Sequence, residues 1–224
     1  STLFPYTTLF RSRTGWIGGK CVDQSAAHVV AREGLARTFQ NIRIFAGMSV
    51  MENVLVAARQ VEPNVAAAER VARRELAGVG LLEYADRPAA SLAYGSRRQL
   101  EIARALALDP RFLLLDEPAA GMNPVETQKL TEMLARVREE RGLGIVLIEH
   151  DLRLVMNLCA RIIVLDQGRM IAAGTPSEVQ GNPAVVAAYL GSRTGAKALP
   201  DIATQSDNAQ ANTQASTARR SLHA

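Results

Sequence analysis

Two adjacent acidic residues, Asp116 and Glu117, stand where a strongly apolar segment ends. The preceding residues 112–115, FLLL, are typical of a buried strand, so both carboxylates lie at its carboxyl end, where ligands of open α/β sheets bind. Two like charges there repel each other, and a compensating cation is expected nearby. An Asp that binds Mg²⁺ beside a Glu that activates water would perform phosphoryl hydrolysis. A solvated Asp-Glu turn before Pro118 is the plain alternative.

A glycine lies just before a predicted helix in the same stretch of sequence. Residues 97–108 carry apolar side chains at helical spacing, and LAYGS, residues 92–96, comes directly before them. The free N–H groups and the dipole of a helix amino end favour an anion such as a phosphate, and Gly95 lets the backbone approach it closely. An ordinary glycine-containing helix start is the alternative at this position.

A glycine pair followed by lysine, GGK at residues 18–20, does not fit a phosphate-binding loop. The P-loop pattern G-x-x-x-x-G-K-[ST] has four residues between its first glycine and the Gly-Lys pair. Here Gly15 and Gly19 enclose only three residues, and Cys21 stands where Mg²⁺ needs an oxygen ligand. The segment is instead predicted to be a turn at Gly18-Gly19 between two short strands.

The predicted elements form an α/β domain with a largely parallel sheet. Two apolar strands, RFLLLDEP and GIVLIEHD, flank a helix over 124–141. A further helix is expected at 151–158, followed by a hairpin that turns at Gln167-Gly168 and by two short helices. Residues from about 42 to 105 have a mostly helical pattern, which predicts a helical subdomain inserted in the α/β core.

Composition excludes several classes of protein. A chain of 224 residues that is 48% hydrophobic and 21% charged can bury a full core. Its apolar runs are far shorter than the roughly 18 residues that a membrane span requires. The net charge of +4 comes without an aromatic-interleaved basic stretch, so no nucleic-acid partner is expected. Cys21 and Cys159 lack metal-binding spacing and are expected to be buried free thiols.

Several segments, in this order along the chain, resemble motifs of the ATP-binding cassette (ABC) ATPases. ARTFQNIRIF resembles the Q-loop, LAYGS with EIARAL the signature region, FLLLDEP the Walker B strand, AAGMNP at 119–124 the D-loop, and IEHD the switch histidine. The resemblance covers roughly residues 15–191 and implies a P-loop NTPase-like parallel sheet core with the inserted helical subdomain. DEPAAGMNP, LIEHDLRLVM and GTPSEVQGNPAVVAAYLG are most similar to ATPase subunits of branched-chain amino-acid importers.

The resemblance implies roles for individual residues in the binding and hydrolysis of ATP with Mg²⁺. Glu117 is the implied catalytic base, and His150 the implied contact to the γ-phosphate. Asp116 would hold Mg²⁺ directly and Gln40 through water. The residues implied at the nucleotide are Gln40, Leu92, Ala93, Tyr94, Gly95, Ser96, Asp116 and Asn123. Ser96 and Gln99 depart from the expected LAYG[DE]xRR pattern, which puts the signature-loop contacts in question.

The resemblance also implies partners and a location. The partners are integral-membrane permease subunits, a second ABC ATPase subunit in a homo- or heterodimer, and indirectly a periplasmic substrate-binding protein. The expected location is peripheral, on the cytoplasmic face of the inner (plasma) membrane. A short permease helix is expected in a groove lined by residues near 40–45 and 48–53. Urea, lipopolysaccharide and non-transport systems use similar ATPases and stay open as alternatives.

The printed sequence contains no P-loop motif. GWIGGKCVD occupies the place of a hairpin that follows the P-loop in this family. Residues 1–12, STLFPYTTLFRS, resemble translated sequencing-adapter sequence and are expected to be a non-native leader, with a partial ATPase domain at 13–191 and a disordered tail at 192–224. A natural regulatory subunit without a P-loop, which offers LAYGS to a partner's ATP, is the alternative.

The 224-residue polypeptide is therefore predicted to bind Mg-ATP weakly or not at all, and not to turn it over. It lacks the amide nest and the lysine that hold the β- and γ-phosphates. Titration of the purified chain with a fluorescent ATP analogue measures the affinity. Micromolar binding together with steady hydrolysis would contradict the prediction.

Overall fold

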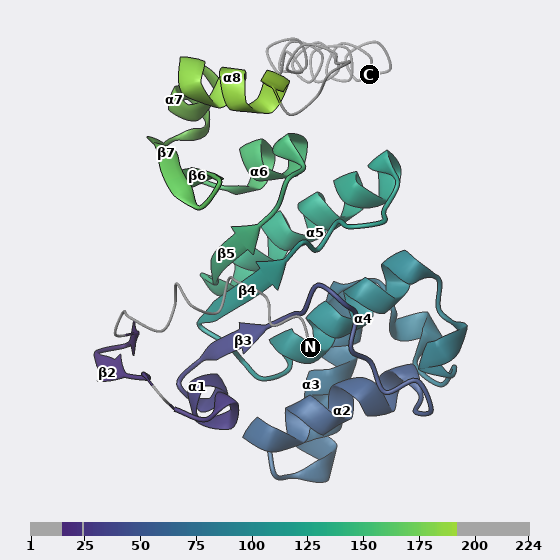
Figure 1. The fold of residues 1–224 in the computed structure, drawn as a ribbon. Coiled ribbons are helices and arrows are strands. Elements are labelled where there is room, and N and C mark those ends of the chain that lie inside the picture. Colours follow the sequence, from purple (N-terminus) through teal and green to yellow (C-terminus); the bar gives the residue numbers. More distant parts are fainter. Residues whose placement is uncertain (1–14, 24, 192–224) are drawn as a thin grey trace, which may run out of the picture. The chain divides into compact units, whose positions relative to one another are not determined.

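The computed structural model describes residues 15–23 and 25–191, so the predictions for 1–12 and 192–224 lie outside the described residues. The chain forms two compact units, one that ends at Cys159 and one that begins at Ala160 (Figure 1). Within the described part, no helix combines the length and the apolar character that crossing a membrane requires.

A three-stranded parallel sheet lies at the centre of the first unit. Its strands are β3 (Leu35–Arg37), β4 (Phe112–Asp116) and β5 (Gly144–Ile148), in the spatial order β3-β4-β5. Leu113 and Leu115 of the middle strand are buried on one face of the sheet and belong to the main hydrophobic core. The predicted α/β class with a parallel sheet is thus confirmed.

The opposite face of strand β5 is open. Side chains alternate along a strand, so Val146 and Ile148 point away from Ile145 and Leu147, which pack on the core. Val146 is 53% exposed and Ile148 59% exposed. Among the described strands, β5 is paired on one side only, with β4. An apolar strand of this kind normally has both faces of its sheet covered.

Helix α5 (Pro124–Arg141) joins β4 to β5 with the bounds that the sequence predicts. Asn123 and Glu126 form a capping box at its start, Pro124 occupies its first turn, and Gly142 ends it with a φ of 60°. The next helix, α6 (Leu152–Leu158), begins after Asp151, whose carboxylate accepts hydrogen bonds from the first-turn amides. Both helices therefore begin at a polar N-cap residue in the segment that follows a strand.

Three helices form the inserted helical part of the first unit, which confirms that feature of the predicted fold. They are α2 (Val50–Val61), α3 (Val65–Gly78) and α4 (Tyr94–Leu106), which lie grouped together in Figure 1. Single 3₁₀ turns, η2 (Leu82–Tyr84) and η3 (Ala89–Ser91), connect α3 to α4. The buried apolar faces of α2, α3 and α4 belong to the same hydrophobic core as β4.

Helix α4 begins earlier than the sequence predicts. The apolar spacing places its start at Arg97, but the structure starts it at Tyr94, so Gly95 and Ser96 lie in its first turn. Ala93 is the N-cap residue and makes no side-chain hydrogen bond to the first-turn amides. The early start was missed because the sequence has no polar capping residue to mark it.

A short hairpin and a one-helix segment precede β3. Strands β1 (Trp16–Ile17) and β2 (Lys20–Cys21) pair across Gly18 and Gly19, which both have positive φ, and helix α1 (Ala27–Arg32) follows. The predicted Gly18-Gly19 turn is confirmed. Cys21 and Cys159 are both free, but Cys21 is exposed, so its expected burial was wrong: it lies on a two-residue strand with both residues exposed.

The second unit is a hairpin with two short helices. Strands β6 (Ile162–Asp166) and β7 (Arg169–Gly174) pair antiparallel across Gln167 and Gly168, which have φ values of 46° and 78°. Helices α7 (Pro176–Gln180) and α8 (Pro183–Gly191) follow. The hairpin, its turn and the two helices agree with the sequence prediction.

Candidate functional site

The acidic pair lies where the carboxyl ends of β4 and β5 meet. Asp116 is paired with Ile148 in the parallel register, and the Glu117 amide donates to the Ile148 carbonyl at 2.9 Å. Glu117 has a φ of +44°, a left-handed conformation that costs a non-glycine residue about 1–2 kcal/mol. Strain of this kind is frequent at functional sites, which agrees with the role predicted for Glu117.

Gln40 reaches this pair from a distant part of the chain. Its Nε2 atom donates to Glu117 Oε2 at 3.1 Å, although 77 residues separate the two. Gln40 lies three residues beyond strand β3, which pairs with β4, so neighbouring parallel strands bring the two side chains to one edge of the sheet. The structure thus joins two residues that the sequence predicts for one site.

Asp116 has a cationic partner that the sequence analysis missed. Arg37 Nη2 lies 3.2 Å from Asp116 Oδ2, and both side chains remain partly exposed. A cation was expected beside the two carboxylates, and in the structure a guanidinium of strand β3 takes that place. Arg37 and Asp116 stand close in space because β3 and β4 pair in register, with Arg37 opposite Leu114.

A buried ion pair on helix α4 holds the loop that carries Gln40. Arg98 and Glu101 are 0% and 2% exposed, and their side chains lie 2.7 Å apart. Arg98 donates to the carbonyls of Phe39 and Gln40, at 2.6 and 2.8 Å. Glu101 accepts from the amides of Phe39 and Arg43, at 3.4 and 3.2 Å. Two side chains of α4 therefore fix the backbone on both sides of Gln40.

The predicted switch histidine follows β5 and is open to solvent. The His150 side chain is 77% exposed, whereas the preceding Glu149 side chain is 1% exposed. Glu149 accepts backbone hydrogen bonds from Ala119, at the turn after β4, and from His150. The sequence analysis did not single out Glu149; its only signal is an acidic residue directly after an apolar strand.

The predicted signature residues form a second group, at the start of α4. The Tyr94 ring packs closely against Gly121: a Cβ atom placed on Gly121 would lie only 3.2 Å from the ring. Gly95 faces the carboxylate of Glu126. The first-turn amides of α4 have no side-chain cap, which leaves them available to an anion. Ala93, Gly95 and Ser96 lie at or in this first turn.

Two residues predicted at the nucleotide have other roles for their side chains. Leu92 is 6% exposed and packs in the core, so its backbone alone can face a ligand. The Asn123 side-chain oxygen accepts from the amides of Val125 and Glu126 and caps α5. A nucleotide contact of either residue stays a prediction.

The donor set at the end of β4 fits Mg²⁺ if phosphate and water complete it. Asp116, Glu117 and Gln40 supply hard oxygen atoms, the ligand type that Mg²⁺ prefers. Within the described residues, no group of three or more His, Cys, Asp or Glu side chains could hold a metal ion. Protein-bound Mg²⁺ commonly uses one or two carboxylates together with substrate phosphates and water, which agrees with this sparse set.

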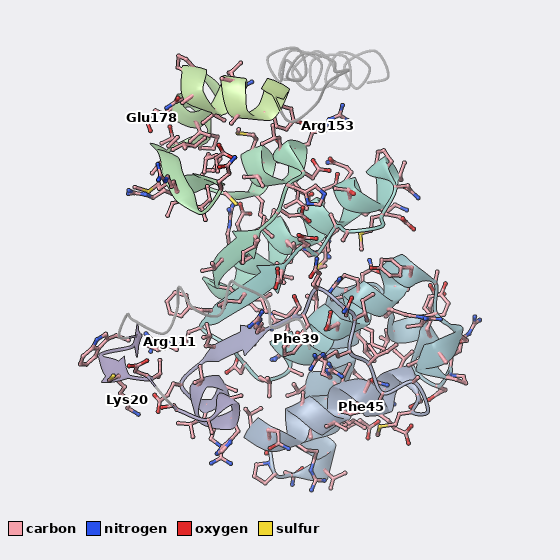
Figure 2. All side chains as sticks on the ribbon, in the orientation of Figure 1. Lys20, Phe39, Phe45, Arg111, Arg153 and Glu178 are labelled. Atoms are coloured by element: carbon pink, nitrogen blue, oxygen red, sulfur yellow. The ribbon has the colours of Figure 1, made fainter. Side chains whose placement is uncertain are left out.

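A groove of about 400 Å³ lies between the Gln40 loop and helices α2 and α4. Its rings are Phe39 and Phe45, which are 36% and 46% exposed; Figure 2 shows Phe39 near the end of β3 and Phe45 beside α2. Three arginines stand over these rings: Arg37 and Arg43 over Phe39, and Arg104 over Phe45. The full lining is Arg37, Phe39, Arg43, Ile44, Phe45, Val56, Ala57, Glu101, Arg104, Ala105 and Leu108.

The predicted lining of this groove is correct on one side only. Residues 43–45 line it, but the segment 48–53 does not. Asn53 is fully buried and bonds to the backbone of Phe45 and Ser49, so it supports the loop from behind. Phe45 is 46% exposed and is not part of the buried core; a docking role for it stays a prediction.

Comparison with protein families gives two matches. The model of the ABC transporter family matches residues 2–120, and that of the branched-chain amino acid ATP-binding cassette transporter matches residues 169–194. The first match contains Gln40, Asp116 and Glu117. The second covers β7, α7 and α8 of the second unit.

Relatives and a solved structure give the same assignment. The high-affinity branched-chain amino acid transport ATP-binding protein BraF of Pseudomonas aeruginosa is 43% identical over 209 residues, covering 85% of this chain and 82% of BraF. LivG of Escherichia coli K12, described in the same words, is 43% identical and covers 83% and 82%. The ADP conformation of MJ1267, an ATP-binding cassette of an ABC transporter, superposes with a TM-score of 0.68 at 25% identity, covering 83% of each chain.

Replacing Arg98 by methionine is predicted to destabilise the fold by about 3–5 kcal/mol, because the variant leaves the Glu101 carboxylate buried without its partner. Adding Glu101→Leu removes that charge, so the double variant should lose less stability than the two single variants together. Urea denaturation followed by circular dichroism measures each loss.

The exposed pair Arg73–Glu69 on α3 supplies the matched control. Arg73→Met should change the free energy of unfolding by less than about 0.5 kcal/mol. Equal losses in Arg98→Met and Arg73→Met would show that the buried pair has no structural role.

Proposed function

The chain belongs to the ABC transporter ATPase family, and from this premise we propose that it serves as the ATP-hydrolysing subunit of an importer for branched-chain amino acids. The observation that carries the hydrolytic role is the contact of Gln40 with Glu117, beside Asp116, at the carboxyl end of the sheet. The cargo rests on the names of the relatives and on the second family match at residues 169–194.

Glu117 acts as the general base in this proposal. Its carboxylate takes the proton of the attacking water, and the Gln40 amide fixes the orientation of that carboxylate through the 3.1 Å hydrogen bond. Asp116 would hold Mg²⁺ through its carboxylate oxygens, Gln40 would contribute through water, and His150 would contact the terminal phosphate. Bound ATP with Mg²⁺ supplies the phosphoryl group and the charge that neutralises the leaving phosphates.

Arg37 and a bound Mg²⁺ would share the Asp116 carboxylate. Arg37 contacts its Oδ2 atom, and the Asp116 side chain is 26% exposed. Releasing Arg37 would cost little, because ion pairs between partly exposed groups contribute about 0–1 kcal/mol.

The start of α4 serves a different nucleotide in this proposal, the one bound by a second ATPase subunit. Tyr94 packs against Gly121, two residues before Asn123, and the uncapped amides at the start of α4 would form the anion site. The alternative function, a regulatory partner subunit that offers this surface to a partner's ATP, rests on the same start of α4.

The groove between the Gln40 loop and α4 is the proposed docking site for a permease helix. Its exposed rings suit a helix laid in an apolar groove, and its three arginines favour an acidic residue on that helix. Through this contact the chain would sit peripherally on the cytoplasmic face of the inner membrane. A periplasmic substrate-binding protein would then be an indirect partner.

Glu117→Gln tests the hydrolytic role in a chain extended by an in-frame P-loop segment. The variant keeps the size of the side chain but removes the base, so hydrolysis should fall by a factor on the order of 10² to 10⁴ while ATP binding survives. It should elute from size exclusion as an ATP-dependent dimer, whereas Asp116→Asn, without its metal ligand, should not.

Glu132→Gln, on the exposed side of α5, is the control and should hydrolyse ATP at the parent rate. If Glu117→Gln also keeps the parent rate, Glu117 is not the base, and His150 becomes the next residue to replace.

Phe45→Ala tests the docking groove in the same extended chain. Loss of an exposed aromatic ring that the permease helix would cover should weaken co-purification with the permease subunits by about tenfold and leave basal ATP hydrolysis unchanged. Val61→Ala is the matched control, because Val61 is also 46% exposed but lies outside the groove. Undiminished co-purification of Phe45→Ala would place the docking site elsewhere.

A further inference from the structure

Glu149 is a buried carboxylate that the proposed chemistry does not use. Its side chain is 1% exposed; among the described residues no lysine or arginine pairs with it, while His150 Nδ1 lies 3.6 Å from its Oε2 atom. A buried carboxylate is costly unless other groups satisfy its charge. The structure must therefore provide hydrogen-bond donors at this position.

Backbone amides from two separate turns supply these donors. Glu149 Oε1 accepts from the Ala119 amide at 2.9 Å, in the turn that follows β4. Glu149 Oε2 accepts from the His150 amide at 2.9 Å and from the Asp151 amide at 3.3 Å, in the turn that follows β5. One side chain thus bridges the ends of two neighbouring strands.

The two bridged turns carry the two candidate catalytic side chains. Glu117 lies two residues before Ala119, and its own amide donates to the Ile148 carbonyl, directly before Glu149. The Ala120 amide donates back to the Glu117 carbonyl at 3.1 Å, which closes the first turn. Moving Ala119 away from Glu149 would therefore disturb Glu117 and His150 together.

We infer that Glu149 is a positioning residue that locks the His150 turn to the Glu117 turn, so that the two candidate catalytic residues move as one unit. This role rests on the proposed function of Glu117 and His150.

Glutamine and alanine replacements at Glu149 separate the bridge from general stability. Glutamine keeps the volume but has one acceptor oxygen, and its NH₂ group must face donors on the other side. Glu149→Gln should therefore release one of the two turns, and Glu149→Ala should release both. Glu139→Gln, at a 76% exposed carboxylate, is the control.

Amide hydrogen exchange, resolved by NMR on the 224-residue chain, measures the release. Exchange at Ala119 or at the pair His150 and Asp151 should accelerate about ten- to a hundredfold in Glu149→Gln, as expected for loss of a charge-assisted hydrogen bond. All three amides should accelerate in Glu149→Ala, while core amides of α2 and α4 keep their rates. The Cε1–H resonance of His150 should shift in both variants, and that of His28 should not.

Two results would overturn the inference. The first is parent-like exchange at all three amides. The second is equal acceleration at these amides and in the core of α2 and α4, which would mean that Glu149 serves global stability only. Because the measurement needs no nucleotide, its failure is distinct from failure of the hydrolytic role, which the activity of Glu117→Gln decides.

Discussion

The buried ion pair between Arg98 and Glu101 is the constraint on which the arrangement around Gln40 depends. A loop has no regular ladder to fix its backbone, and here side chains of α4 satisfy two carbonyls and two amides of residues 39–43. An apolar pair of the same volume could be equally stable, but it could not hold these polar groups. The ion pair therefore determines where Gln40 lies, and with it the contact to Glu117.

The same pair joins two surfaces with different proposed partners. Glu101 lines the groove proposed for a permease helix, and Arg98 lies in the helix whose first turn is proposed to face a second ATPase subunit. Arg43 lies in the groove as well, and its amide donates to Glu101. A change at either surface acts on one rigid helix, so the Gln40–Glu117 contact can respond to both partners.

The sequence predicted the elements whose signals are local. Strands β4 and β5 follow from uninterrupted apolar runs, and α5 follows from apolar residues at helical spacing after Pro124. The start of α4 was missed because Ala93 gives no capping signal. Strand pairing also accounts for the correct grouping of Gln40 with Glu117, since both follow parallel strands.

The missed residues act through partners that no local pattern encodes. In the sequence these are ordinary charged residues: Arg37, Arg98 and Glu149. Their importance appears only in the structure, where each contacts a backbone group or a carboxylate from a distant part of the chain. Arg98 stands in a run of polar residues, RRQ, that reads as a solvated face, yet it is fully buried. Arg98 is buried because helix α4 packs against the loop of residues 39–43, and a local sequence pattern does not show this packing.

Among the described strands, β5 has one exposed face and one unpaired side, and such a strand is prone to self-association. The strand GIVLI has no charged residue and no proline, and it is rich in residues that favour strands. Val146 and Ile148 are more than half exposed. An edge strand of this composition is a template on which another chain can add a strand. Concentrated preparations should thus lose material to aggregates, and a lysine at Val146 would act as a gatekeeper.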